Sequence, residues 1–371
     1  MHVPALHVAH GVCYAILAYE VGQSIDLEAC AQRITTITQR ARISPKRRTP
    51  PYFAYRLAPL RLTQEAVMLP FGDYGSSTSV DMVLYDFGAV SLTYHIPLRG
   101  PLRDLLALSA ALDNNPQLRH DARRRLEEIL AVVQDAVQRP HIADMVEDYA
   151  IFQIEAFASP CSAAELYTTY AQEVAQILRV EPTTLSDQEV HDAISHRIAF
   201  GLDDVAIIDW HAALLCDREA DDVRAVLEFA NVELLEMRYL DEQLDDALDQ
   251  AYEALSRHAW RWPRRPGAAA ADLHRVGQMQ VDSAMLFEGV NNTLKLFGDQ
   301  YLARVYRLAS QRFHLEEWDA SIMRKLRTLE SIYAKISDHA TNQRMEILEW
   351  IIIILITVSI VLPLVSSIPW H

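Results

Sequence analysis

The sequence predicts an α+β N-terminal body, followed by a helical coiled-coil hairpin or bundle and by one C-terminal transmembrane helix. Three observations support this fold class. Val, Tyr, Phe, Thr and Ile gather in short stretches of the first half, as they do in strands. The second half repeats apolar residues at spacings of three and four, and the chain closes in an aliphatic run. We therefore expect domains over 1–216, 217–346 and 347–369.

The composition is that of an acidic globular protein. Half of the 371 residues are hydrophobic, and 50 acidic residues outnumber 34 basic ones, for a formal net charge of -16. Phosphate backbones repel such a chain, so nucleic acid is an unlikely partner except indirectly through a ribosome. The four cysteines form no CxxC pair, and we expect them to be reduced and buried.

Strands and helices are expected to alternate in the N-terminal half. The predicted strands cover 12–19, 52–57, 65–70, 80–96 and 148–157. The predicted helices cover 27–38, 102–112, 122–137 and 162–178. The last of these helices begins with Ser162, a good N-cap, and Glu165 follows at the spacing of a capping box.

Residues 196–215 are typical of a hairpin that turns at Asp203 and Asp204. The segment DDVAIIDWHAALL at 203–215 also resembles DFGAVSLTYHIPL at 86–98, and a helix is expected after each. This loose similarity suggests an internal duplication within the α+β domain.

Apolar residues between 223 and 255 follow a heptad-like pattern. Acidic residues fall outside that stripe, so we expect one solvated face and one packed face. They are Glu228, Glu233, Glu236, Asp245, Asp246 and Asp249. A second stripe over 315–339 can supply the packing partner, which predicts an antiparallel hairpin or small bundle.

Two basic segments are candidates for contact with a partner or a membrane. A solvated linker or loop is the alternative for each. The first precedes two prolines and the second contains a Pro- and Gly-rich turn at 258–272. Their candidate residues are Arg40, Arg42, Lys46, Arg47, Arg48, Trp260, Arg261, Trp262, Arg264 and Arg265.

Residues 347–368 contain fifteen Ile, Leu or Val residues and a single charge, Glu349. About 20 apolar residues cross the hydrocarbon core of a bilayer, so a transmembrane helix is expected. Trp350 and Trp370 bracket the run at the two predicted membrane interfaces. Positive residues precede the run and none follows it, which predicts a single-pass protein of the cell inner membrane with a cytoplasmic body. In a eukaryote the corresponding place is the mitochondrial inner membrane.

The usual marks of catalysis are absent from the sequence. It contains no P-loop, no GxGxxG after a strand, no HExxH and no GxSxG. Asp203, Asp204, Asp209 and His211 can group carboxylates with an imidazole, but turn aspartates commonly bind local backbone. We therefore predict no catalytic, cofactor-binding or metal-binding residues.

Three segments resemble the "required for meiotic nuclear division" family. They are YDFGAVSLTY at 85–94, DDVAIIDW at 203–210 with the helix after it, and RMEILEWIIIILI at 344–356. The resemblance implies an α+β body, a helical stalk and a C-terminal anchor. It also implies, for mitochondrial relatives, a role in holding the ribosome near the inner membrane.

Together these features predict a tail-anchored, non-catalytic scaffold or tether that positions a cytoplasmic partner. The bilayer and a protein partner, or a second copy bound through the coiled coil, are the expected contacts. A membrane-associated enzyme with an unrecognised site in the α+β domain is the alternative, as is a ribosome or RNA tether.

Overall fold

The computed structural model describes residues 5–38, 44–45, 59–201, 203–258, 277 and 300–366. They belong to two compact units. The first unit comprises Met1–Tyr239 and Leu286–Asp319, and the second comprises Leu240–Met285 and Ala320–His371.

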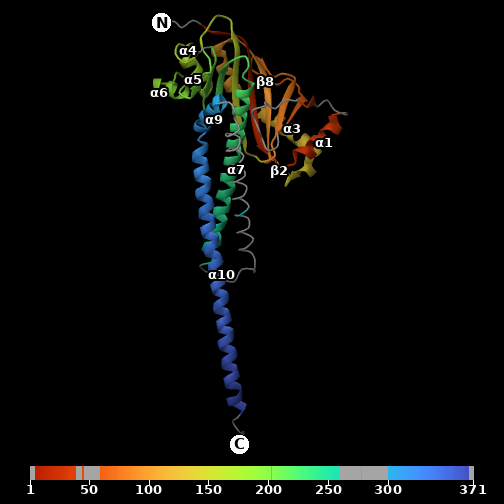
Figure 1. Cartoon of the computed structure of the whole chain (residues 1–371), viewed down its shortest axis with the longest axis vertical. Helices are drawn as coiled ribbons and strands as arrows, with labels where there is room; N and C mark the ends of the chain where they lie inside the picture. The colour runs from red at the N-terminus through yellow and green to blue at the C-terminus, as the bar shows by residue number, and fades with distance from the viewer. Residues whose placement is uncertain are drawn as a thin grey trace. The chain divides into compact units, whose positions relative to one another are not determined.

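A mixed nine-stranded sheet lies at the centre of the first unit (Figure 1). Its strand order is β11-β12-β13-β10-β1-β8-β7-β4-β3, and only the β10–β13 pair is parallel. The strands are β1 (His7–Glu20), β3 (Ser44–Pro45), β4 (Leu60–Glu65), β7 (Ser79–Leu84), β8 (Ala89–Pro101), β10 (Val146–Phe157), β11 (Arg197–Ile198), β12 (Val205–Ile208) and β13 (Ala212–Cys216). The pairs β2 (Ser24–Ile25) with β9 (Val137–Gln138) and β5 (Pro70–Phe71) with β6 (Tyr74–Gly75) stand apart from it. The predicted α+β body is thus confirmed.

The predicted strand over 80–96 is wrong as a single element. It is two strands, β7 and β8, joined by a turn at residues 85–88. Gly88 closes the turn at a φ of 111°, and a Cβ atom there would lie 1.8 Å from the carbonyl oxygen of Gly22. The left-handed turn therefore requires glycine, which interrupts an otherwise strand-like sequence. Similarly, β4 and β5 replace the predicted strand at 65–70, and residues 52–57 lie outside the described residues.

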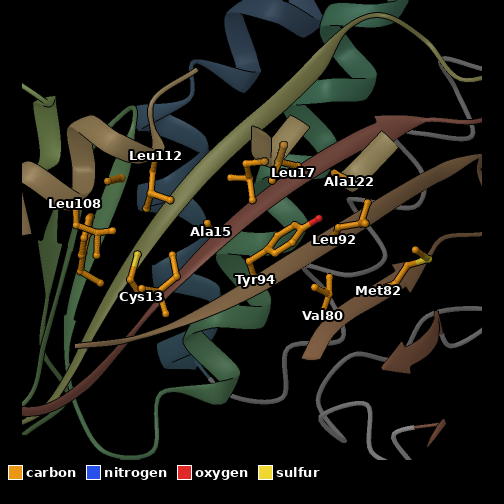
Figure 2. Close-up of a cluster of buried hydrophobic side chains, with 14 of the residues drawn as sticks. Cys13, Ala15, Leu17, Val80, Met82, Leu92, Tyr94, Leu108, Leu112 and Ala122 are labelled. Atoms are coloured by element: carbon orange, nitrogen blue, oxygen red, sulfur yellow. The ribbon is translucent and has the colours of Figure 1, made fainter. Parts of the chain in front are cut away.

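Helices α1, α2, α3 and α5 contribute to a hydrophobic core against one face of the sheet. Figure 2 shows Cys13 and Leu17 of β1, Leu92 of β8, and Leu108 and Leu112 of α2 within this core. The helices of the body are α1 (Leu27–Thr38), α2 (Leu105–Leu112), α3 (Pro116–Val133), α4 (Ala163–Leu166), α5 (Ala171–Arg179) and α6 (Asp187–Ala193). Because alternate residues of a strand face opposite sides, the neighbouring residues of β1 point to the other face.

That other face is covered by α7 (Asp221–His258) and α9 (Gln300–Arg312). Ser91 of β8 contacts Glu228 of α7 at 2.8 Å, and Tyr85 packs against Phe229 of the same helix. On the α9 side, Phe313, the residue after the helix, packs edge-on against Tyr149 of β10. The central strands are therefore covered on both faces.

The second unit contains the later part of α7 and most of α10 (Leu315–Ser366). Leu244 and Ala251 of α7 are buried, as are Leu326 and Leu329 of α10. Lys325 binds carboxylates of α7 at 2.8 Å and 2.6 Å. The two helices run in the same direction (Figure 1), so the predicted antiparallel pairing is wrong. A tight turn cannot join them, since α9 lies between them in the sequence.

The prediction of a transmembrane helix over 347–369 is not upheld: within the part of the chain that the structure describes, no helix is long and apolar enough to cross a bilayer. Helix α10 does extend through this region to Ser366. Side chains are described there for Glu349 and for 351–356, and the last five residues lie outside the described residues.

Candidate functional site

A small cavity of about 30 Å³ opens in the first unit, with room for about one or two water molecules. Five chain segments meet around it: β1, the start of β10, the α2–α3 turn, the end of α5 and the β12–β13 turn. Its polar lining includes Asp113, Asn115, Arg119, Asp148 and His211. The cavity is thus bordered by both acidic and basic side chains.

Asp148 is an acid of this cavity whose pKa is shifted. Burial raises the pKa of its carboxyl above the ordinary value, although the nearby Arg119 acts in the opposite direction. The Arg119 guanidinium lies 3.4 Å from that carboxylate. Val180, also in the lining, has a φ of 55°, which is strained for a β-branched residue. A shifted acid beside a strained residue marks this cavity as a candidate binding site.

A second polar cluster surrounds Asp209 in the β12–β13 turn. Its side chain is 1% exposed and accepts hydrogen bonds from Arg179 of α5 at 3.0 Å and from Arg312 of α9 at 2.5 Å. Asp192 of α6 also binds both guanidinium groups, and Glu189 binds Arg179. One buried carboxylate and two arginines thus connect α5, α6 and α9 to the sheet.

The structure separates the four residues that the sequence grouped as acid–base candidates. Asp204 accepts hydrogen bonds from the backbone N–H groups of Phe200 and Gly201, as expected of a turn aspartate. Asp209 binds the two arginines, whereas His211 lines the cavity beside Asp148. The hairpin turns at residues 209–211 and not at the predicted aspartates. Strand β12 also pairs with the short strand β11, along the edge opposite to β13.

Three acidic residues near the start of α7 form a third cluster, and their predicted exposure is wrong. Asp245, Asp246 and Asp249 of the same helix are exposed, as predicted. Glu228, Glu233 and Glu236 are 5%, 3% and 7% exposed, because the sheet and α9 enclose this part of the helix. Sequence periodicity assigned these charges to solvent because carboxylates seldom occur inside a protein.

Each of these buried acids has a specific partner. Ser91 donates to Glu228 at 2.8 Å, and Tyr306 of α9 donates to Glu233 at 2.5 Å. Glu236 is hydrogen-bonded to Glu20 of β1. Burial raises the pKa of Glu233 to about 8 and that of Glu236 to about 7.

A fourth acid, Glu147 of β10, belongs to the same layer. Burial raises its pKa to about 7, although Arg238 of α7 forms an ion pair with it. The same strand accepts a hydrogen bond from Asn231 of α7 at the Glu147 carbonyl oxygen. On the second face of the sheet, burial therefore raises the pKa values of Glu147, Glu233 and Glu236 to near neutrality, although their polar partners act in the opposite direction.

The basic segments predicted to contact a partner or a membrane lie outside the described residues. This holds for Arg40, Arg42, Lys46, Arg47 and Arg48. It holds equally for Trp260, Arg261, Trp262, Arg264, Arg265 and Trp370. Trp350 lies in α10, but its side chain is outside the description. Among the described residues, no group of three or more His, Cys, Asp or Glu is placed to hold a metal ion.

Replacing Asp209 tests the importance of the arginine cluster. Asp209→Asn leaves Arg179 and Arg312 without their buried counter-charge, which is expected to lower the free energy of unfolding by about 3–5 kcal/mol. Asp203→Asn, at an exposed position of the neighbouring loop, is the control and is expected to change it by less than about 0.5 kcal/mol. Denaturant titration followed by circular dichroism measures both. Equal stability of the two variants would show that the cluster contributes nothing.

Comparison with known proteins gives one family and one relative. Residues 10–222 match the family described as "Uncharacterized protein MJ0711, N-terminal domain". The Uncharacterized protein MJ0711 of Methanocaldococcus jannaschii is 22% identical over 241 residues, which cover 64% of this chain and 72% of the relative. No solved structure matches the chain.

The family match overturns the resemblance to the "required for meiotic nuclear division" family. The segment on which that resemblance most depended, 344–356, lies outside the matched residues. The similarity between this segment and that family lies in aliphatic composition, which many apolar helices share. The match instead spans the strands and helices from β1 to the start of α7. With more than half of its residues matched, this chain belongs to the family of the MJ0711 N-terminal domain.

Proposed function

We propose that this protein is a non-catalytic scaffold, attached to a lipid bilayer by the apolar end of α10, that positions a protein partner. The observation that carries the proposal is a run of six consecutive exposed aliphatic residues, 351–356, each between 47% and 63% exposed. The packing of α7 with α10 within the second unit supports a coiled-coil segment.

Lipid suits this run better than a helical partner does. Six consecutive residues extend over more than one helical turn of 3.6 residues, so aliphatic side chains point in every direction around the axis. A partner helix covers only one stripe, whereas lipid surrounds the helix on all sides. Transfer of six such residues into lipid contributes about 2 to 4 kcal/mol.

Positive residues precede the aliphatic run and favour the inner face of the cell membrane. Arg324, Arg327 and Lys335 are exposed on α10. The anionic lipids of the cytoplasmic leaflet attract basic residues by about 1 kcal/mol each when they lie near the surface. We therefore propose that the body is held on the cytoplasmic side.

Introducing charge into the run tests the attachment. The double variant Ile353→Lys, Ile354→Lys adds an insertion cost of about 5 to 7 kcal/mol, which exceeds the gain from the run. It should leave the membrane pellet and remain in the supernatant after detergent-free lysis and high-speed centrifugation.

Ser331→Lys is the matched control, because it adds the same charge to α10 at an exposed position outside the run. This variant and the wild type should sediment with membranes and be released by detergent. If the wild-type chain itself stays in the supernatant, the proposed attachment is wrong.

A second candidate function is small-ligand chemistry in the cavity. The raised pKa of Asp148 beside Arg119 and His211 favours it, whereas pockets for small molecules commonly measure about 300–1,000 Å³. Mass spectrometry of extracts from denatured wild-type protein distinguishes the two functions. A small molecule that is lost in Asp148→Asn supports ligand chemistry, and its absence from both supports the scaffold.

A further inference from the structure

We infer that α7 and α9 are held on the sheet by protonated carboxyl groups, and that this contact loosens reversibly as the pH rises above neutrality. The inference concerns the second face of the sheet and is independent of membrane attachment. It rests on the positions of Glu233 and Glu236 and on the groups that face them.

The first of the two contacts that involve protonated carboxyl groups joins Glu233 of α7 to Tyr306 of α9. The Tyr306 hydroxyl of α9 donates to the Glu233 carboxyl at 2.5 Å, and both side chains are buried, at 4% and 3% exposed. Phe229 packs beside Tyr306, with 6.4 Å between ring centroids. Ionisation of Glu233 would leave a charge in surroundings that offer it a phenol hydroxyl and an aromatic ring, which is costly.

The second of these contacts joins Glu236 of α7 to Glu20 of β1. Two carboxyl groups can form a hydrogen bond only if at least one of them carries a proton, because ionised carboxylates are acceptors alone. Glu20 is 4% exposed, and the pair joins α7 to β1, at the centre of the sheet. Loss of the shared proton would place two negative charges side by side in a buried contact.

Two arginines of the layer contact other carboxylates. Arg238 of α7 binds Glu147 of β10, and Arg61 of β4 lies 3.8 Å from Glu228. Ser91 of β8 donates to Glu228 as well. The two arginines thus contact Glu147 and Glu228, respectively, whereas Glu233 contacts Tyr306 and Glu236 contacts Glu20.

The direction of the pH effect follows from linkage. Glu233 has an ordinary pKa of 4.5 when exposed and about 8 when buried, so the closed contact binds more protons than the open one between these values. Stability of the contact is complete at low pH and falls as the pH rises toward 8. Each such group changes the opening equilibrium by at least about tenfold between pH 6 and pH 9.

Hydrogen–deuterium exchange of the full chain in mild detergent tests the inference. After correction for the intrinsic pH dependence of exchange, amides of α7 at 225–237 and of α9 should lose protection by at least about tenfold between pH 6 and pH 9. Amides of α2 and α3, on the other face, should keep their protection.

Glu233→Gln and Glu236→Gln, made singly, provide the matched variants because an amide resembles a protonated carboxyl in shape and cannot ionise. Each should reduce the pH dependence at α7 and α9. Gln172→Glu is the control, since it adds an acid in α5, away from the second face, and should leave that dependence unchanged. The inference is overturned if wild-type α7 is equally protected at both pH values, or if both Gln variants keep the full wild-type dependence.

Discussion

The need to cover a sheet on both faces is the constraint on which the rest of the first unit depends. One face of β1 and β8 is apolar and is covered by α2 and α3, as Figure 2 shows. The opposite face carries Glu20 and Ser91, and it is closed by the buried acids of α7. Hydrogen bonds and protonation must offset the cost of burying these groups, which makes the second face the more sensitive to its environment.

The arginine cluster around Asp209 complements this arrangement at one end of the sheet. Arg312, at the end of α9, binds the β12–β13 turn, and Tyr306 binds Glu233 two turns earlier in the same helix. Helix α9 is therefore held by a charged contact and by a neutral one. In the proposed scaffold, the second contact can respond to pH while the first keeps α9 in place.

Local signals predicted the parts of this fold that depend on neighbouring residues. The helix at 27–38 has its predicted bounds, and the Ser162–Glu165 capping box is present. Contacts between distant segments could not be predicted: Asp209 lies 103 residues from Arg312, and Glu233 lies 73 from Tyr306. The heptad pattern of α7 correctly marked Leu244 and Ala251 as buried, but the same pattern placed Glu233 in solvent. A prediction from periodicity assigns charged residues to the exposed face of a helix. It therefore cannot identify a buried acid that keeps its proton.

The central claim is that the second face of the sheet holds protonated acids at neutral pH. Infrared difference spectroscopy between the wild type and Glu233→Gln observes the carbonyl stretch of a protonated carboxyl directly. The account predicts a protonated-carboxyl band at pH 7 that is present in the wild type and missing in the variant. A difference spectrum that shows only ionised carboxylate at pH 6 would contradict it.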